Sequence, residues 1–181
     1  MLYSELQCSE AIRKAVERMG FAEMTEIQEK TIPVMLAGHD VIAKAPTGTG
    51  KTCAFGIPVA EHIQPENKYP QAVIMAPTRE LAQQIAEELS DLTYFMPEVQ
   101  VACVYGGANM EKQAKRLAEG CQIVVATPGR LMDHYKHHSI DISHVTQIVL
   151  DEADEMLNMG FYKDVRHIIE MMKARKALSM F

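Results

Sequence analysis

The chain has 181 residues, 48% hydrophobic and 23% charged, a composition typical of one globular, soluble domain. Its formal net charge of −6 excludes a protein that binds nucleic acid mainly through bulk positive charge, so any such binding must use a few placed arginines, backbone amides and helix N-termini. No apolar run is long enough to cross a bilayer, and the N-terminus does not resemble a signal peptide. The four cysteines form no Cys-x-x-Cys pair, which argues against a disulfide framework or zinc site and favours a cytoplasmic location.

Segments with helical and strand-like patterns alternate along the chain. Apolar residues at helical spacing predict helices near residues 11–19, 81–92 and 165–172, and the segment 64–71 is expected to be a surface loop. Short, nearly continuous apolar runs predict strands that are buried on both faces of a parallel sheet. These strands are expected at Asp40–Ala45, Ala72–Ala76, Val99–Tyr105, Gln122–Thr127 and Thr146–Asp151, with Leu178–Phe181 as a possible sixth.

The repeated strand–helix–strand order predicts the fold class α/β, an open, mainly parallel sheet flanked by helices. Residues 1–181 would form a single domain of this type. Because ligands of such sheets bind at the carboxyl ends of the strands, candidate site residues should lie directly after the predicted strands.

A phosphate-binding loop (P-loop) is expected after the first predicted strand. Residues 45–52 read Ala-Pro-Thr-Gly-Thr-Gly-Lys-Thr and precede a helical stretch; Ala45 stands where the first glycine of the motif is usual. Glycines let the backbone amides face phosphate, Lys51 can reach the β and γ phosphates, and the Thr52 hydroxyl can ligate Mg²⁺. The alternative is a glycine-rich turn with an incidental lysine. The strand before and the helix after favour a nucleotide site made of Pro46, Thr47, Gly48, Thr49, Gly50, Lys51 and Thr52.

An acidic run, Asp151-Glu152-Ala153-Asp154, follows another predicted buried strand. In isolation it would be interpreted as a solvated face, but a parallel sheet would place it beside the P-loop. Asp151 is then expected to help hold Mg²⁺, directly or through a water, and Glu152 to orient or deprotonate the attacking water. With Lys51, these two carboxylates are the predicted catalytic residues.

The chain resembles the N-terminal core domain, a RecA-like P-loop NTPase domain, of the DEAD-box ATP-dependent RNA helicases. Asp-Glu-Ala-Asp at 151–154 is the signature of that family, and other motifs occur in the family's order over essentially the whole chain. Gly20-Phe21 followed by Thr25-Glu26-Ile27-Gln28 is similar to its Q motif, with Tyr3 at the usual upstream aromatic position, and this region is carried by helices expected within residues 1–37. The remaining matches are Pro77-Thr78-Arg79-Glu80-Leu81-Ala82, Gly106-Gly107 and Thr127-Pro128-Gly129-Arg130.

The resemblance implies that ATP and Mg²⁺ are the cofactors. Gln28 would read the adenine edge, with Phe21 packed on the ring and Thr25 beside it; an amide carries the donor and the acceptor that adenine requires. Thr25 and Gln28 also have the spacing of a helix capping box, and the pattern alone does not separate the two roles. Met24 stands where the family usually has proline.

The resemblance also implies sequence-independent contact with the backbone of single-stranded RNA or a short duplex. The matching residues are Pro77, Thr78, Arg79, Gly107, Thr127 and Arg130. Without the family, these would be interpreted as ordinary turn residues and surface arginines. We expect no aromatic platform for stacking bases. His134 and His138 would share a helix face, but an exposed helix end is favoured there over a metal pair.

The family's Ser-Ala-Thr motif and second helicase domain are absent from this chain, and Asp154 would couple to that missing domain. We therefore expect a monomeric domain without membrane contact that hydrolyses ATP poorly alone and remodels RNA duplexes when joined to the second domain. Alternative interpretations are a DNA helicase or protein-translocating motor, against which Gln28 and residues 151–154 argue, and a non-catalytic nucleotide- or partner-binding module.

Overall fold

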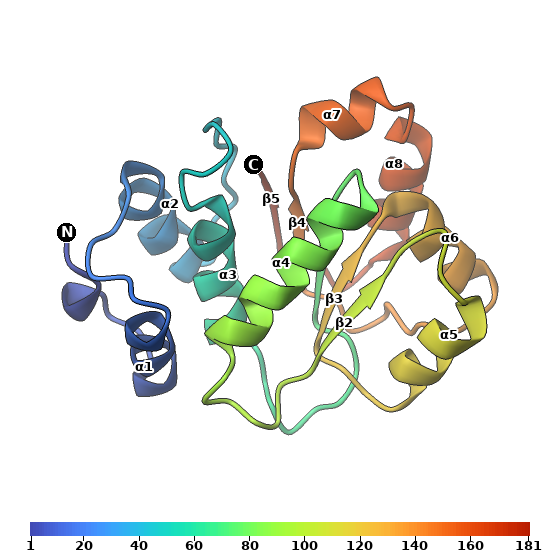
Figure 1. Ribbon diagram of the computed structural model, residues 1–181. Helices are drawn as coiled ribbons and strands as arrows, with labels where there is room; N and C mark the ends of the chain where they lie inside the picture. Colours follow the sequence, from blue (N-terminus) through green and yellow to red (C-terminus); the bar gives the residue numbers. More distant parts are fainter.

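Five parallel strands form one sheet in the order β2-β3-β1-β4-β5 (Figure 1). The structure, a computed structural model, describes residues 1–181. Its strands are β1 Ala72–Met75, β2 Val101–Val104, β3 Ile123–Ala126, β4 Gln147–Leu150 and β5 Ala177–Met180. The helices are a short 3-10 helix η1 at Tyr3–Glu5, then α1 Glu10–Arg18, α2 Glu26–Leu36, α3 Lys51–Glu61, α4 Arg79–Leu92, α5 Met110–Ala118, α6 Pro128–Lys136, α7 Ala153–Asn158 and α8 Tyr162–Met171.

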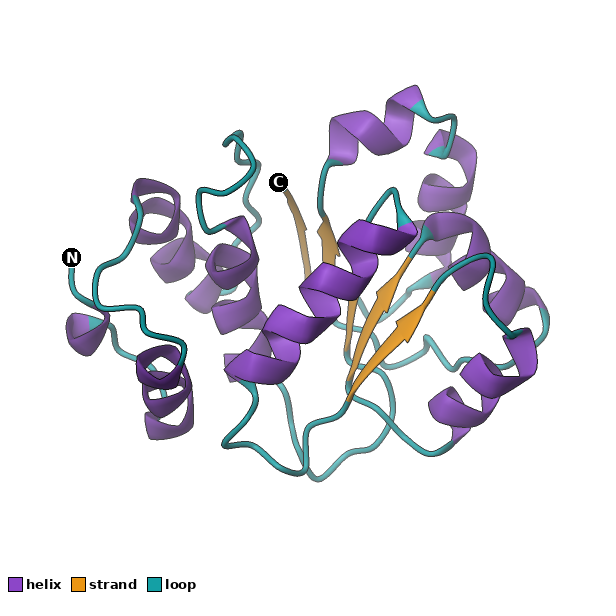
Figure 2. Ribbon diagram, viewed as in Figure 1, coloured by secondary structure: helices purple, strands orange, loops and turns teal.

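Helices cover both faces of the sheet, which confirms the predicted fold class (Figure 2). One apolar core joins the sheet to α1–α4 and includes Phe55, Ile74 and Leu89. The second lies on the other face, against α6 and α8, and includes Leu131 and Ile148. The central strands β1, β3 and β4 are buried at every position, as their continuous apolar runs predict, whereas the outer strands β2 and β5 are partly exposed.

The strand predicted at Asp40–Ala45 is wrong. This segment makes a single bridge, Ile42 to Met180, beyond β5, with Ala43 N and Met180 N as the donors of the two backbone hydrogen bonds. It lies at the edge of the sheet and pairs on one side only, so Ile42 is 85% exposed and the ladder ends after one bridge. The other strands are confirmed, each shorter than predicted except β5, which begins one residue earlier than Leu178.

The helix α3 runs through the interior between the sheet and its neighbours α2 and α4. Eight consecutive residues, Cys53–Ala60, are buried, which is expected of a helix that is apolar all round. The ring of Phe55 packs edge-on against Phe181, 5.3 Å away, and so holds the start of α3 against the end of β5. As a result, the first turn of α3 is fixed beside the carboxyl ends of the strands.

The N-terminal residues fold back on the start of α2. Tyr3 N donates to Ala22 O and Met24 N to Met1 O, and Leu2 forms an antiparallel bridge with Glu23. These contacts bury the ring of Tyr3 against the rest of the core. Residues 1–3 therefore pack beside the residues of the Q motif.

No helix is long and apolar enough to span a membrane. All four cysteines are free thiols. Burial raises the pKa of Cys53 to about 12 and that of Cys121 to about 11, so these thiols act as packing groups rather than nucleophiles.

Candidate nucleotide and nucleic-acid site

The P-loop curls at the carboxyl edge of the sheet, where α7 and the first turn of α4 also lie (Figure 1). Gly48 and Gly50 have φ angles of +84° and +79°, a left-handed conformation that favours glycine. The Thr49 hydroxyl donates to Pro46 O at 2.6 Å and closes the loop. Exposed at its tip are Pro46, Thr47 and Gly48. Lys51 begins α3, so the positive end of that helix faces this loop.

Lys51 joins the P-loop to the acidic run after β4. Its Nζ atom lies 2.6 Å from Oε1 of Glu152 and 3.7 Å from Oδ1 of Asp151. Lys51 and Asp151 are nearly fully buried, while Glu152 is partly exposed. The three predicted catalytic residues are therefore brought together, with the ammonium between two carboxylates.

Asp151 carries a buried oxygen that has no hydrogen-bond partner, Oδ1. Burial raises the pKa of this carboxyl, and the nearby ammonium of Lys51 opposes the rise. A buried carboxylate oxygen without a partner suits a hard cation such as Mg²⁺, or one of the waters that Mg²⁺ retains. Thr52 follows Lys51 on α3, within the same site.

No group of three or more His, Cys, Asp or Glu side chains is arranged to hold a metal ion. Mg²⁺ would therefore depend on few protein ligands together with phosphate and water, which is its usual mode in nucleotide sites. The donor set of Thr52 and Asp151 fits that mode.

Glu152 has a left-handed backbone, with φ +52° and ψ +49°, at the N-cap of α7. Such a conformation is uncommon for a non-glycine residue and stores strain on the order of 1–3 kcal/mol. It turns the chain sharply between β4 and α7 and directs the Glu152 carboxylate toward Lys51. Asp154, two residues later, is exposed, and its carboxylate accepts from Glu155 N.

Gln28 is buried and connects three segments of the chain. Its Oε1 atom accepts from the Tyr3 hydroxyl at 2.5 Å and from Thr25 N at 2.9 Å, and its Nε2 donates to Gly50 O at 3.1 Å. The capping box with Thr25 is thus present. The same amide also contacts the P-loop at Gly50 O. Gln28 therefore caps α2 and lies next to the P-loop in a single side-chain conformation.

Phe21 is exposed and lies beside this cluster, its ring stacked on that of Tyr3 with centroids 6.5 Å apart. A cavity of about 330 Å³ lies between the start of α2 and the P-loop and is lined by Thr25, Pro46 and Thr49, among others. Of the nucleotide residues predicted from the sequence, Thr25, Pro46 and Thr49 line this cavity, while Phe21 lines a separate one with Tyr3.

A second row of predicted residues follows β1, β2 and β3 at the same edge. Pro77 is buried, Thr78 caps α4 by accepting from Leu81 N, and Arg79 is exposed. The guanidinium of Arg79 lies 4.7 Å from the centre of the Tyr105 ring, and a Cβ on Gly107 would stand 3.7 Å from Arg79 Nη1. The sequence analysis predicted no aromatic platform for stacking bases; the ring of Tyr105 instead supports the guanidinium of Arg79.

Arg130 is held at the start of α6, one turn after its N-cap Thr127. Its Nη1 donates to Ala108 O and to Gln113 Oε1, both at 3.0 Å. Gln113 is buried; its Nε2 donates to Tyr105 O, and its Oε1 also contacts His134 Nε2 at 3.2 Å. One amide therefore joins the segment after β2 to the start of α6.

The prediction that the histidines lie at an exposed helix end is wrong for His134. This side chain is completely buried, because it lies on the inner face of α6 against α5, while His137 and His138 are exposed. Burial and the nearby Arg130 guanidinium lower the pKa of His134. Its Nδ1 atom has no hydrogen-bond partner.

Sequence reasoning assigned Tyr3 to the Q motif but did not predict its hydrogen bond to Gln28, and it gave no role to Tyr105 or Gln113. It also missed Glu88 on α4: burial raises the pKa of this carboxyl, and Thr52 and Asp151 are among the neighbours that act on it. No helix was predicted around Gln113, so the sequence analysis gave no signal for this buried amide on α5.

Comparison with known proteins gives a consistent assignment. A family model described as DEAD/DEAH box helicase matches residues 25–181. The chain is 52% identical over 170 residues to the "ATP-dependent RNA helicase CshA" of Limosilactobacillus reuteri, covering 94% of this chain and 34% of that protein. It is 42% identical over 179 residues to the "ATP-dependent RNA helicase DeaD" of Escherichia coli, covering 99% of this chain and 28% of that protein.

Solved structures agree with this result. A DEAD box protein from Methanococcus jannaschii superposes with a TM-score of 0.91 at 40% identity, covering 99% of this chain and 49% of that one. A hypothetical ATP-dependent RNA helicase from Sulfolobus tokodaii gives 0.88 at 41% identity, covering 96% and 50%. The chain thus spans about a third of the length of the curated relatives that it matches.

Proposed function

Because the chain belongs to the DEAD/DEAH box helicase family, we propose that it is the ATP-binding half of an ATP-dependent RNA helicase. It binds Mg²⁺-ATP and the backbone of single-stranded RNA at the carboxyl edge of its sheet. Joined to a second helicase domain, it couples hydrolysis to the remodelling of RNA duplexes. The observation that carries the proposal is the cluster of Lys51, Asp151 and Glu152 beside the P-loop, in which Lys51 and Asp151 are buried.

Phosphate binding falls to the P-loop and to Lys51. The amides of residues 47–52 and the start of α3 supply a positive environment for the β and γ phosphates. Lys51 exchanges Glu152 for phosphate when nucleotide binds, since a dianionic phosphoryl group is the stronger partner. Bound Mg²⁺, held by Thr52 and Asp151, would neutralise charge on the phosphate oxygens.

Release of Lys51 leaves the Glu152 carboxylate free to accept a proton from the attacking water or to orient it. The strained backbone at Glu152 supports this role because it fixes the direction of the side chain before nucleotide arrives. Hydrolysis by this chain alone is expected to be slow, since an arginine supplied opposite the phosphates contributes several orders of magnitude in rate. Asp154, which is exposed, is the residue expected to contact the second domain.

Adenine recognition falls to Gln28, with Phe21 packed on the ring and Thr25 at its edge. Rotation of the Gln28 amide away from Gly50 O would offer its donor and acceptor to the base. RNA would contact Arg79, Arg130 and the turns around them, which are Pro77, Thr78, Gly107 and Thr127; these contacts position the strand without reading its sequence.

The proposal is tested by calorimetric titration of the chain with ADP, ATP and GTP in Mg²⁺. We expect adenine nucleotides to bind more tightly than GTP. Lys51→Ala should abolish the binding of adenine nucleotides and of GTP, whereas Gln28→Ala should reduce the preference for adenine. Gln7→Ala, an exposed glutamine outside the site, serves as the matched control. Equal binding of ATP and GTP, unchanged by Gln28→Ala, would reduce Gln28 to a helix cap and contradict the adenine site.

A further inference from the structure

A closed ring of hydrogen bonds holds Arg130 against the turn at Gly106-Gly107. The Nη1 atom of Arg130 donates to Ala108 O, directly after the two glycines, and to Oε1 of Gln113, both at 3.0 Å. The Nε2 atom of Gln113 donates to Tyr105 O, directly before the glycines, at 3.1 Å. The ring therefore joins both ends of the glycine turn to the guanidinium, and Gln113 is the only side chain in it besides Arg130.

The amide of Gln113 is buried and fully occupied by these contacts. The side chain is 8% exposed and projects from α5, whose other buried residue is the apolar Leu117. A buried amide costs free energy unless its donor and its acceptor both find partners. A methionine would fill the same space without that requirement. Gln113 therefore contributes through its hydrogen bonds rather than through apolar packing.

His134 fixes the orientation of this amide. Its Nε2 atom lies 3.2 Å from Oε1 of Gln113, so Oε1 faces two N–H donors while the Gln113 Nε2 faces a carbonyl. The reverse orientation of the amide would place donors against donors and an oxygen against the Tyr105 carbonyl. The acceptor of Gln113 is therefore held toward Arg130.

The ring leaves one nitrogen of the Arg130 guanidinium free. Nη1 is used twice within the protein, and Nε lies 3.7 Å from Oδ2 of Asp133, whereas Nη2 makes no hydrogen bond or ion pair. The Arg130 side chain is only 13% exposed, so the neighbouring residues decide where the free nitrogen points. A guanidinium that is already oriented loses less rotamer entropy when it binds a phosphate.

We propose that Gln113 is a positioning residue for RNA binding. It holds Arg130 and the glycine turn in the geometry that a backbone phosphate of RNA requires, without contacting RNA itself. The inference rests on the proposed function, in which Arg130 and Gly107 contact RNA. It adds to that function a buried residue on α5 that joins the contact segment after β2 to the contact segment after β3.

The test is fluorescence anisotropy of a labelled single-stranded RNA with the chain and its variants. Gln113→Met keeps the length of the side chain and removes its donor and its acceptor. We expect RNA affinity to fall about threefold to tenfold, because Arg130 regains part of its rotamer freedom. Gln113→Glu keeps an acceptor for Arg130 but adds a charge that competes with phosphate for the guanidinium. It should therefore weaken RNA binding at least as much.

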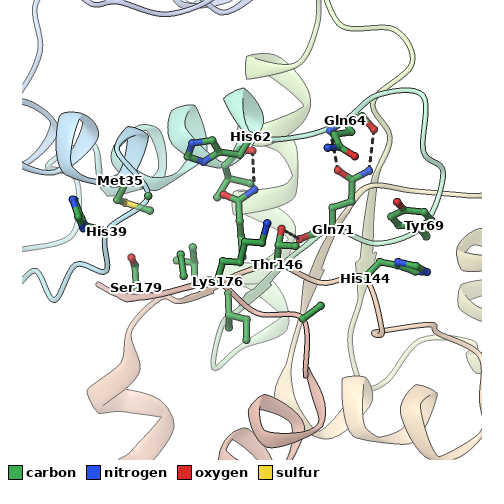
Figure 3. A pocket seen from close by; sticks show the side chains of 17 residues that line it. Met35, His39, His62, Gln64, Tyr69, Gln71, His144, Thr146, Lys176 and Ser179 are labelled. Carbon is green, nitrogen blue, oxygen red and sulfur yellow. Dashed lines mark hydrogen bonds between the residues drawn. The ribbon is translucent and has the colours of Figure 1, made fainter.

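Gln71→Met is the matched control for the loss of a buried amide. Gln71 is 5% exposed and lies directly before β1, at the amino end of the sheet, away from the predicted RNA contacts. Its amide accepts from Gln64 N at 2.8 Å and donates to Gln64 O at 2.9 Å, as Figure 3 shows, and it also donates to Asn67 O. We expect Gln71→Met to lower the melting temperature but to change RNA affinity less than twofold.

A double-mutant cycle separates this inference from the proposed function. Arg130→Ala should weaken RNA binding. In that background Gln113→Met should have less than a twofold further effect, because the residue that it positions is absent. If Arg130→Ala binds RNA as the wild type does, the proposed RNA site and this inference both fail. The positioning role alone is overturned if Arg130→Ala weakens binding but Gln113→Met does not, if the two effects multiply, or if Gln71→Met weakens binding as much as Gln113→Met.

Discussion

Oε1 of Glu152 lies 2.6 Å from Nζ of Lys51, so the P-loop lysine is paired with the carboxylate after β4 before phosphate binds. The contact joins residues 101 positions apart in the chain. It pairs the Lys51 ammonium with a carboxylate of the chain itself, and nucleotide binding must exchange this partner.

Removing the negative charge of Glu152 should therefore strengthen nucleotide binding. Glu152→Gln frees Lys51 and removes a repulsion of the phosphates, and we expect ADP and ATP affinities to rise roughly threefold to tenfold, or about 0.7–1.4 kcal/mol. In the two-domain protein the same variant should hydrolyse ATP much more slowly. Calorimetry measures the first effect and an RNA-stimulated ATPase assay the second.

Glu155→Gln, an exposed carboxylate on α7, is the control for a general change of charge. The prediction would be contradicted if Glu152→Gln weakened nucleotide binding while Glu155→Gln did not. In that case the Glu152 carboxylate would contribute to nucleotide binding instead of competing with phosphate for Lys51.

The two glycines of the P-loop should differ in their tolerance of a methyl group. A Cβ on Gly48 meets nothing within 4 Å, so Gly48→Ala should cost only the strain of positive φ, about 1–2 kcal/mol. A Cβ on Gly50 would stand 2.3 Å from Gln28 Nε2, so Gly50→Ala should cost about 1–3 kcal/mol more. Urea unfolding of both variants measures the difference in free energy of unfolding.

The excess cost of Gly50→Ala should largely disappear in the Gln28→Ala background, because the clashing atom is then absent. A coupling energy of roughly 0.5–3 kcal/mol is expected from such a double-mutant cycle. Strictly additive effects would mean that Gln28 moves aside freely and does not constrain the P-loop.

Acid should destabilise the chain in part through His134. The pKa of this imidazole is lowered in the folded protein by burial and by Arg130, so between that value and the ordinary value the unfolded chain binds a proton that the folded chain does not. Stability from this group is therefore present above the unfolded pKa and is lost as pH falls below it. The Nδ1 atom is buried and has no hydrogen-bond partner. A proton on this atom would therefore lack an acceptor in the folded state.

The measurement is urea unfolding at pH 7.5 and pH 5. The wild-type chain should lose measurably more free energy of unfolding between the two pH values than His134→Gln does. His137→Gln, an exposed position on the same helix end, should behave like wild type. Identical losses in all three proteins would exclude His134 as a source of acid sensitivity.

Tyr105 should contribute to RNA affinity through Arg79. Tyr105→Ala removes the ring beneath the guanidinium and should weaken binding of a labelled single-stranded RNA roughly twofold to fivefold, the 0.5–1 kcal/mol typical of an exposed cation–π pair. Tyr105→Phe keeps the ring and loses only the hydrogen bond from Gln83, so its effect should be smaller. Arg79→Ala should weaken binding further and reduce the salt dependence by about one counterion.

Fluorescence anisotropy at several salt concentrations makes this comparison. Tyr94→Ala is the control, because Tyr94 forms the same kind of pair with Arg18 at the other end of α4. Equal losses for Tyr94→Ala and Tyr105→Ala would indicate a general effect on stability rather than support of Arg79.

The sequence by itself determined the features that depend on local pattern. Continuous apolar runs predicted β1, β3 and β4, since a strand buried on both faces needs apolar side chains at every position. The spacing of glycine, lysine and threonine predicted the P-loop, because its backbone can curl around phosphate only with glycines at set positions. These patterns lie within a few residues, so no knowledge of packing was needed.

Only the tertiary structure decided the contacts between segments that are distant in sequence. Tyr3 meets Gln28 because the N-terminus folds back on α2, and Gln113 holds both Arg130 and His134 because α5 and α6 pack together. The segment at 40–45 has the composition of a strand but lies at the sheet edge with one neighbour, so a single bridge forms. Local periodicity gives the type of each element. The partners of a side chain depend on how whole elements pack, and this depends on the hydrophobic free energy of the entire chain.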